Sequence, residues 1–114
     1  MRSEDKIRLR HILDEAGEAI KFAEGISFES FTKDSKTVHA IFRAIEVIGE
    51  AAAKISGECK ELYPDIPWAD IVGMRNHLIH VYFDIDYETV WKTVKTDVPN
   101  LIKIIEPLLK DVKE

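Results

Sequence analysis

Apolar residues recur three or four positions apart over most of this chain. They do so first between Ser3 and Gly25, and again between position 34 or 35 and Gly57. This spacing puts the apolar side chains on one face of an α-helix. Ser3 has the side chain of a helix cap, and glycine commonly ends a helix. The pattern predicts two long amphipathic helices, with a short helical turn at 27–33 between them.

The second half of the chain begins with a predicted connector at 58–66, which contains a proline followed by an aspartate. Proline is favoured at the first position of a helix, because its missing N–H would have no partner there. Pro67 is therefore expected to open a third helix, which the apolar spacing carries to about Phe83.

Asp86 is expected to cap a fourth helix that continues through Val98. Pro99 either kinks this helix or starts a fifth segment over 101–112. The fold class predicted for the chain is all-α: an up-and-down bundle of four or five helices in a single domain over 1–114.

The composition limits the classes of function. The chain has 114 residues, 46% of them hydrophobic and 32% charged, with a net charge of −5 and a pI of about 5.4. An acidic protein of this kind does not bind duplexes over a broad basic surface, so any contact with nucleic acid must be local. Cys59 is the single cysteine and cannot form an intramolecular disulfide. The charged N-terminus and the lack of a long apolar run predict a cytoplasmic protein.

The segment 74–82 places several polar groups in what is otherwise an apolar helical pattern. These groups are Arg75, Asn76, His77, His80 and Tyr82. Burying them costs free energy unless they are paired or used. Arginine binds phosphate through a planar fork of donors, and histidine exchanges protons near neutral pH. This combination suits chemistry on a phosphodiester.

On an ideal helix Asn76 and His80 share a face, whereas Arg75 lies about 140° and roughly 7.5 Å from His80. The long arginine stem, a helix distortion or a second protomer must close that gap. A second apolar stripe on the same helix indicates that another protein surface covers it, and a homodimer is the simplest partner. The stripe consists of Val72, Ile79 and Phe83.

Other interpretations of these residues stay open. An arginine and a histidine on a helix often have only structural roles, each in a salt bridge or another satisfied polar contact. His77 and His80 have the spacing of metal ligands, but no third ligand follows at a supportive distance. Trp68 and Trp91 are expected to anchor a core or an interface rather than stack on bases. The chain could also be a non-catalytic module that binds a protein partner or a nucleotide, or a purely structural dimerisation bundle.

The string from Arg75 to Tyr82 resembles the Arg-x-x-x-x-His-x-Tyr signature of HepT-type toxins in the HEPN superfamily. The segment 43–52 is similar to that family's second helix, and Val90-Trp91 to its downstream segment. The residues just before the motif are also similar to those of the family. They are Pro67-Trp68, Ile71, Gly73 and Met74.

The resemblance implies an all-helical, homodimeric endoribonuclease that needs neither metal nor cofactor. It further implies the toxin of a type II or type VII-like toxin–antitoxin pair, with an MntA-like minimal nucleotidyltransferase as the antitoxin partner and RNA as the substrate. Arg75 and His80 carry over as the catalytic pair, and Asn76 as the residue that helps to position substrate or histidine. Tyr82 carries over as the hydroxyl that the antitoxin modifies with AMP.

Overall fold

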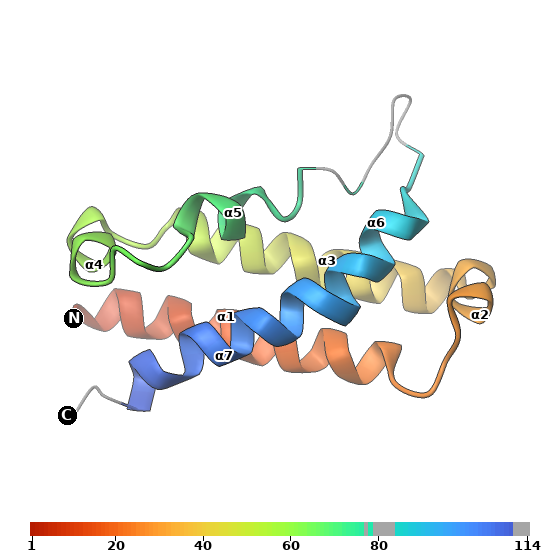
Figure 1. Cartoon of the computed structure of the whole chain (residues 1–114), viewed down its shortest axis with the longest axis horizontal. Coiled ribbons are helices and arrows are strands. Elements are labelled where there is room, and N and C mark those ends of the chain that lie inside the picture. Colours follow the sequence, from red (N-terminus) through yellow and green to blue (C-terminus); the bar gives the residue numbers. More distant parts are fainter. Residues whose placement is uncertain (77, 79–83, 111–114) are drawn as a thin grey trace.

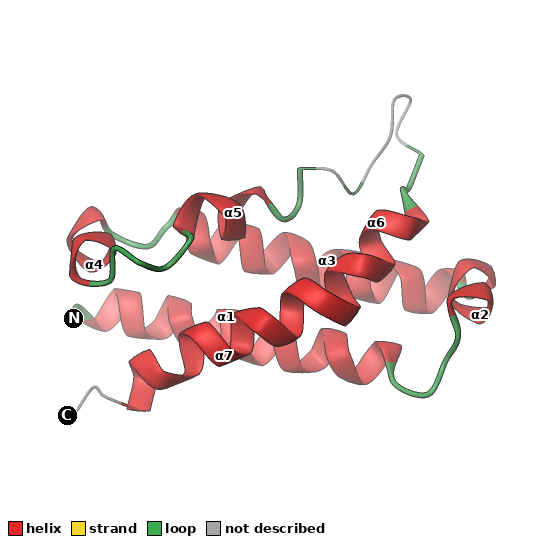
Figure 2. Ribbon diagram, viewed as in Figure 1, coloured by secondary structure: helices red, strands yellow, loops and turns green. Residues whose placement is uncertain are grey.

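The computed structural model describes residues 1–76, 78 and 84–110, and these residues form helices and loops with no β-strand beyond the single bridge residue Ile85 (Figure 2). The elements are α1 Ser3–Ala23, α2 Phe28–Lys33, α3 Ser35–Ala53, α4 Gly57–Leu62, α5 Trp68–Gly73, α6 Tyr87–Lys92, the π-helical η2 Thr93–Asp97 and α7 Val98–Lys110. The predicted all-α class is confirmed.

The core lies between the three long helices. α1 and α3 run antiparallel side by side, and α7 crosses over α1, while α5 packs on α3 (Figure 1). Most of the largest side chains with essentially no exposure come from these helices and from the short α2, and they include Leu9, Ile12, Phe31, Ile41, Ile45, Ile48 and Ile105. Within the described ranges, no helix is both long enough and apolar enough to cross a bilayer.

Several of the predicted helix ends are confirmed. The Asp34 carboxylate caps α3 by accepting hydrogen bonds from the backbone N–H and hydroxyl of Thr37, at 3.1 and 2.6 Å. The Asp86 carboxylate caps α6 in the same way. Gly25 has a φ of 74° just beyond α1, a conformation that few other residues adopt. Ser3 is not a cap, because α1 begins at Ser3 and Arg2 is the flanking residue.

The predicted connector over 58–66 is wrong, because it contains most of α4. The Ser56 hydroxyl caps this short helix by accepting a hydrogen bond from the backbone N–H of Cys59 at 3.1 Å. Pro64 lies beyond the end of α4, where a missing backbone N–H does not interrupt a helix.

The chain from Tyr87 to Lys110 is continuously helical, and the π-helical segment η2 separates α6 from α7 (Figure 1). The backbone N–H of Val98 donates to the carbonyl of Thr93, five residues earlier. Pro99 has no N–H to donate, and the wider π turn lies directly before it. Pro99 therefore falls inside a modified helix, at the second residue of α7.

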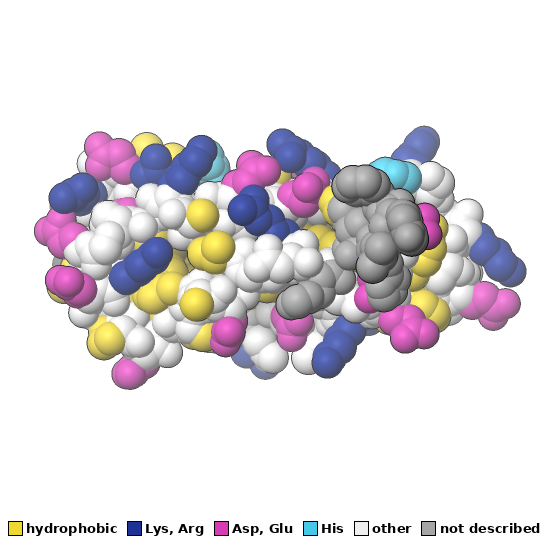
Figure 3. Space-filling view, turned by 90° about the horizontal axis from the view of Figure 1, so that it is seen from above, with side chains coloured by type: hydrophobic (Ala, Val, Ile, Leu, Met, Phe, Trp, Pro, Cys, Tyr) yellow, Lys and Arg dark blue, Asp and Glu magenta, His cyan; other side chains and the backbone are white. Residues whose placement is uncertain are grey.

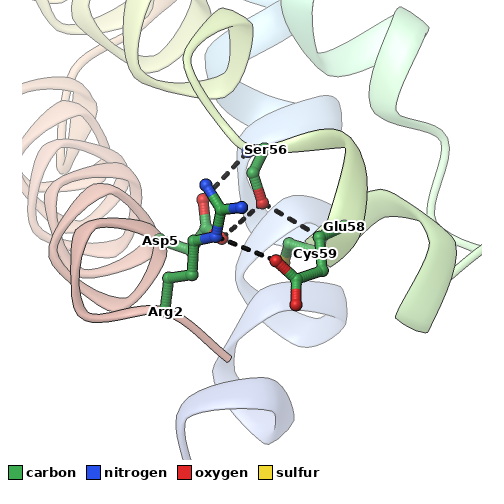
Figure 4. A network of polar contacts seen from close by, with 5 residues as sticks. All are labelled: Arg2, Asp5, Ser56, Glu58 and Cys59. Atoms are coloured by element: carbon green, nitrogen blue, oxygen red, sulfur yellow. Dashed lines mark hydrogen bonds and ion pairs between the residues drawn. The ribbon is translucent and has the colours of Figure 1, made fainter.

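The start of α1 is joined to the start of α4 by a polar network (Figure 4). The carboxylate of Asp5, which is 1% exposed, accepts hydrogen bonds from the backbone N–H and hydroxyl of Ser56 at 2.9 and 2.6 Å. Arg2 pairs with Glu58 at 2.8 Å. Burial alone would raise the pKa of Asp5, but the two hydrogen bonds from Ser56 and the charges of Arg2 and Arg8 lower it below its usual value.

Replacing Asp5 with Ala is expected to destabilise the fold by about 2–3 kcal/mol at neutral pH, because hydrogen bonds to a charged carboxylate are lost and the N–H of Ser56 loses its partner. Since the folded pKa lies below the unfolded value, the contribution of Asp5 is present above about pH 4 and is lost as the pH falls through the folded pKa. Urea unfolding from pH 7 to pH 2.5 measures both effects.

Asp14→Ala, at an exposed position on the same helix, is the matched control and should leave the unfolding curve unchanged. A loss of stability on acidification that is as steep in Asp5→Ala as in the parent chain would contradict this role for Asp5.

Candidate active site

The helix that carries the Arg75 motif is shorter than the sequence predicts. α5 ends at Gly73, and residues 74–76 form turns in which the backbone N–H of Asn76 donates to the carbonyl of Gly73 at 2.9 Å. The prediction of one helix as far as Phe83 is therefore wrong at residues 74–76 and at Leu78, which lies in a bend. Glycine weakens a helix by roughly 1 kcal/mol, and the chain leaves the helix at this residue.

Residue 78 is held firmly in the fold. The Leu78 side chain is fully buried. Its carbonyl accepts a hydrogen bond of 2.8 Å from the backbone N–H of Asp86. Three motif residues lie outside the described residues: His77, His80 and Tyr82. Ile79 and Phe83 of the predicted second apolar stripe also lie outside them.

The stem of Arg75 lies against Gly49 in α3. A Cβ added to Gly49 would be 3.2 Å from Cδ of Arg75, 3.4 Å from its Cγ and 3.2 Å from the carbonyl oxygen of Val72. Such distances are shorter than ordinary van der Waals contact, so glycine is the residue that permits this approach of α5 to α3. The stem of Arg75 and the end of α5 therefore approach α3 most closely at Gly49 among the glycines of the chain.

The Arg75 side chain is exposed, and among the described residues it makes no hydrogen bond or ion pair. Glu50, the residue after Gly49 in α3, pairs with Arg43 at 3.8 Å. The described part of the fold therefore does not support the structural ion pair that the sequence left open for this arginine. Its donors are available to an anion.

Asn76 turns away from α3 toward α6 and η2. Its amide nitrogen would lie 3.5 Å from a Cβ added to Gly73, and its side chain lines an open cleft of about 380 Å³. Asp70 and Met74 also line this cleft, opposite Lys92 and Asp97. Arg75 and Asn76 are thus adjacent in the chain but contact different neighbours.

The face that carries α4 and α5 mixes basic and acidic side chains and shows no broad basic surface (Figure 3). This agrees with the net charge of −5 and with a contact to nucleic acid that is local. In the described ranges, no three histidine, cysteine, aspartate or glutamate side chains are grouped closely enough to hold a metal ion.

Comparison with known proteins gives the family. The model of the family described as "Ribonuclease HepT-like" matches residues 12–108. This chain belongs to the HepT-like ribonuclease family. The match covers the second half of α1, all of α3 and α5, most of α7 and the whole Arg75–Tyr82 motif. It confirms the resemblance found in the sequence.

Curated HepT-like relatives align over nearly their whole length. A Thermococcus cleftensis protein named "Probable ribonuclease HepT" is 45% identical over 86% of this chain and 93% of the relative. A Methanocaldococcus jannaschii protein named as a candidate RNase is 43% identical over 89% and 93%. A third relative, a similarly named protein from Caldanaerobacter subterraneus, is 40% identical over 92% of this chain and 94% of the relative. No solved structure gave a significant match.

Two features of this HepT-like site were missed by reasoning from the sequence. Gly49 lies in the segment 43–52 that carried the resemblance, but nothing in its spacing indicates the contact with Arg75. The α6 and η2 wall of the cleft, with Lys92 and Asp97, was also missed. The sequence offered one signal for this wall, since Pro99 requires an irregularity in the helix.

Proposed function

We propose that this chain is a metal-independent endoribonuclease in which Arg75 and His80 are the catalytic residues. The observation that carries the proposal is the state of Arg75 in this HepT-like chain. Its side chain is exposed and has no partner among the described residues, and its stem lies against Gly49. A positioned arginine with free donors stabilises the negative charge of a phosphorane. The names of the curated relatives, which assign ribonuclease activity to them, support the same reaction class.

In the proposed mechanism, the imidazole of His80 takes the proton of the ribose 2′-hydroxyl, and the 2′-oxygen forms a bond to the adjacent phosphorus. The bond from phosphorus to the 5′-oxygen breaks, and Arg75 stabilises the charge on the phosphorane oxygens meanwhile. The leaving 5′-oxygen takes a proton from a protonated His80 of the second subunit of a homodimer. Asn76 positions the substrate or the histidine. The products are a 2′,3′-cyclic phosphate and a 5′-hydroxyl.

The decisive experiment incubates the purified chain with total RNA in EDTA and identifies the ends of the products. Cleavage that persists in EDTA and leaves 2′,3′-cyclic phosphates is expected. No cleavage at any protein concentration would favour the alternative of a non-catalytic module that partners a nucleotidyltransferase or binds a nucleotide. Cleavage that stops in EDTA would contradict the metal-independent mechanism.

The biological role proposed is that of a toxin in a toxin–antitoxin pair, and it is supported by the complete motif and by membership of the HepT-like family. The partner is an MntA-like nucleotidyltransferase that transfers AMP from ATP to the hydroxyl of Tyr82 with release of pyrophosphate. The added phosphate would bring negative charge into the motif of Arg75 and compete with RNA for the guanidinium.

Incubation with such a partner and ATP is expected to add the mass of AMP to a peptide that contains Tyr82 and to stop RNA cleavage. Tyr82→Phe should remain active and unmodified in the same incubation, which makes it the control. Intact-mass and peptide mass spectrometry measure the modification. Inhibition of Tyr82→Phe as strong as that of the parent chain would show that binding, and not AMP transfer, neutralises the protein.

A further inference from the structure

The cleft beside Asn76 has two walls of different origin. One wall comes from α5 and the turn after it, through Asp70, Met74 and Asn76. The other comes from α6 and η2, and includes Lys92 and Asp97. The volume of about 380 Å³ lies within the range of small-molecule sites, roughly 300–1,000 Å³. η2 is the one π-helical segment in the described part of the chain, and such segments often occur at functional sites.

Some polar side chains of this cleft already have hydrogen-bond partners, and others do not. The hydroxyl of Thr93 donates to the carbonyl of Thr89 at 2.7 Å, and the hydroxyl of Thr89 donates to Asp86 at 2.7 Å. In contrast, four charged or amide side chains of the cleft make no hydrogen bond or ion pair within the described residues. They are Asp70, Asn76, Lys92 and Asp97.

The chemistry of these four groups limits what can bind. Two carboxylates only accept hydrogen bonds, one ammonium only donates them, and one amide does both. Their summed charge is −1 at neutral pH, so a phosphate would be repelled, whereas a neutral group with adjacent N–H donors and a nearby acceptor would be bound. A nucleobase has this character, and Met74 supplies an apolar contact for its ring.

Among the four RNA bases, guanine matches the cleft best. Its N1–H and N2–H₂ donors are adjacent on one edge and fit the two oxygens of a carboxylate, and its O6 and N7 accept from a lysine. Uracil has one N–H donor between two carbonyls, and a carboxylate would face at least one of these carbonyls. Cytosine and adenine each offer an amino group next to a ring nitrogen that only accepts.

We propose that the cleft lined by Asp70, Asn76, Lys92 and Asp97 is a guanine subsite, which binds the base of a nucleotide next to the scissile phosphate. The placement beside that phosphate rests on the proposed ribonuclease function, because Asn76 follows Arg75 directly in the chain. The carboxylates accept from N1–H and N2–H₂, Lys92 donates to O6 or N7, and Asn76 joins the subsite to the catalytic pair. Lys92 and the two aspartates are specificity residues and take no part in proton transfer.

The binding experiment does not depend on catalysis. Guanosine, inosine, adenosine, cytidine and uridine are titrated to millimolar concentration into the full-length ¹⁵N-labelled chain, and amide shifts of α5, α6 and η2 are followed. Guanosine is expected to bind about tenfold more tightly than inosine, which lacks the N2 amino group, and than uridine. In Asp70→Asn/Asp97→Asn the preference for guanosine over inosine should disappear. Asp14→Asn, an exposed aspartate on α1, is the control and should keep it.

A second measurement places the subsite relative to the cut. Oligoribonucleotides that contain a single guanosine are expected to be cleaved next to it, and Lys92→Gln should lower this preference about tenfold. Equal binding of all five nucleosides, or a preference that survives in Asp70→Asn/Asp97→Asn, would overturn the guanine subsite even if RNA is cleaved. Guanosine binding without any RNA cleavage would retain the subsite and overturn the proposed function and the placement that rests on it.

Discussion

Replacing Arg75 with Ala is expected to lower the rate of RNA cleavage about 10²–10³-fold, which is the usual effect of removing one preorganised donor from a transition state. The stability of the fold should change by less than about 0.5 kcal/mol, because the side chain is exposed and makes no polar contact among the described residues. Single-turnover cleavage of a labelled RNA, with thermal unfolding in parallel, measures both quantities.

Arg10→Ala is the matched control, since Arg10 is also an exposed arginine but lies on α1, away from the Arg75 motif. Arg75→Lys should recover only part of the lost rate, because an ammonium cannot form the paired hydrogen bonds of a guanidinium with phosphate oxygens. If Arg10→Ala lowers the rate as much as Arg75→Ala does, the effect is general attraction of RNA, and Arg75 has no role at the reacting phosphate.

The parts of the fold that depend on local chemistry could be predicted from the sequence. Asp34 and Asp86 are caps because a carboxylate can reach backbone N–H groups three residues ahead, and both form those bonds in the structure. The buried position of Leu78 follows from apolar spacing. Apolar spacing does not reveal the path of the backbone, however. Met74 and Leu78 are four residues apart, and this separation suits a helix, yet Met74 lies in a turn and Leu78 in a bend.

The parts that depend on elements meeting in space could not be predicted. The contact between Gly49 and the stem of Arg75 joins α3 to the turn after α5, and no rule of sequence spacing relates positions 26 residues apart. The cleft has the same origin, because Asp70 and Lys92 approach each other only when α5 and α6 both pack on α3. The motif singles out Arg75 and Asn76 as candidates, but their different neighbours required the structure.

Replacing Gly49 with Val is expected to lower the cleavage rate about 10–100-fold and to destabilise the fold by about 1–3 kcal/mol. The new Cβ would lie 3.2 Å from the Val72 carbonyl oxygen and from Cδ of Arg75, so α5 and the arginine stem must shift. A displacement of about 1 Å at a positioning contact can cost up to 10²-fold in rate. Cleavage kinetics and urea unfolding of the same preparations measure the two effects.

Gly17→Val on α1 is the matched control, because nothing lies within 4 Å of an added Cβ there and valine is a better helix former than glycine. It should keep full activity and at least parental stability. The double variant Gly49→Val/Arg75→Ala separates the arginine contact from the backbone contact. If the valine acts through the arginine, it will cause little further loss of rate once Arg75 is alanine, and part of its stability cost will disappear, since residues in contact do not contribute independently. Losses of rate and stability that simply add in the double variant would mean that Gly49 serves the packing of α5 on α3 and does not position the guanidinium.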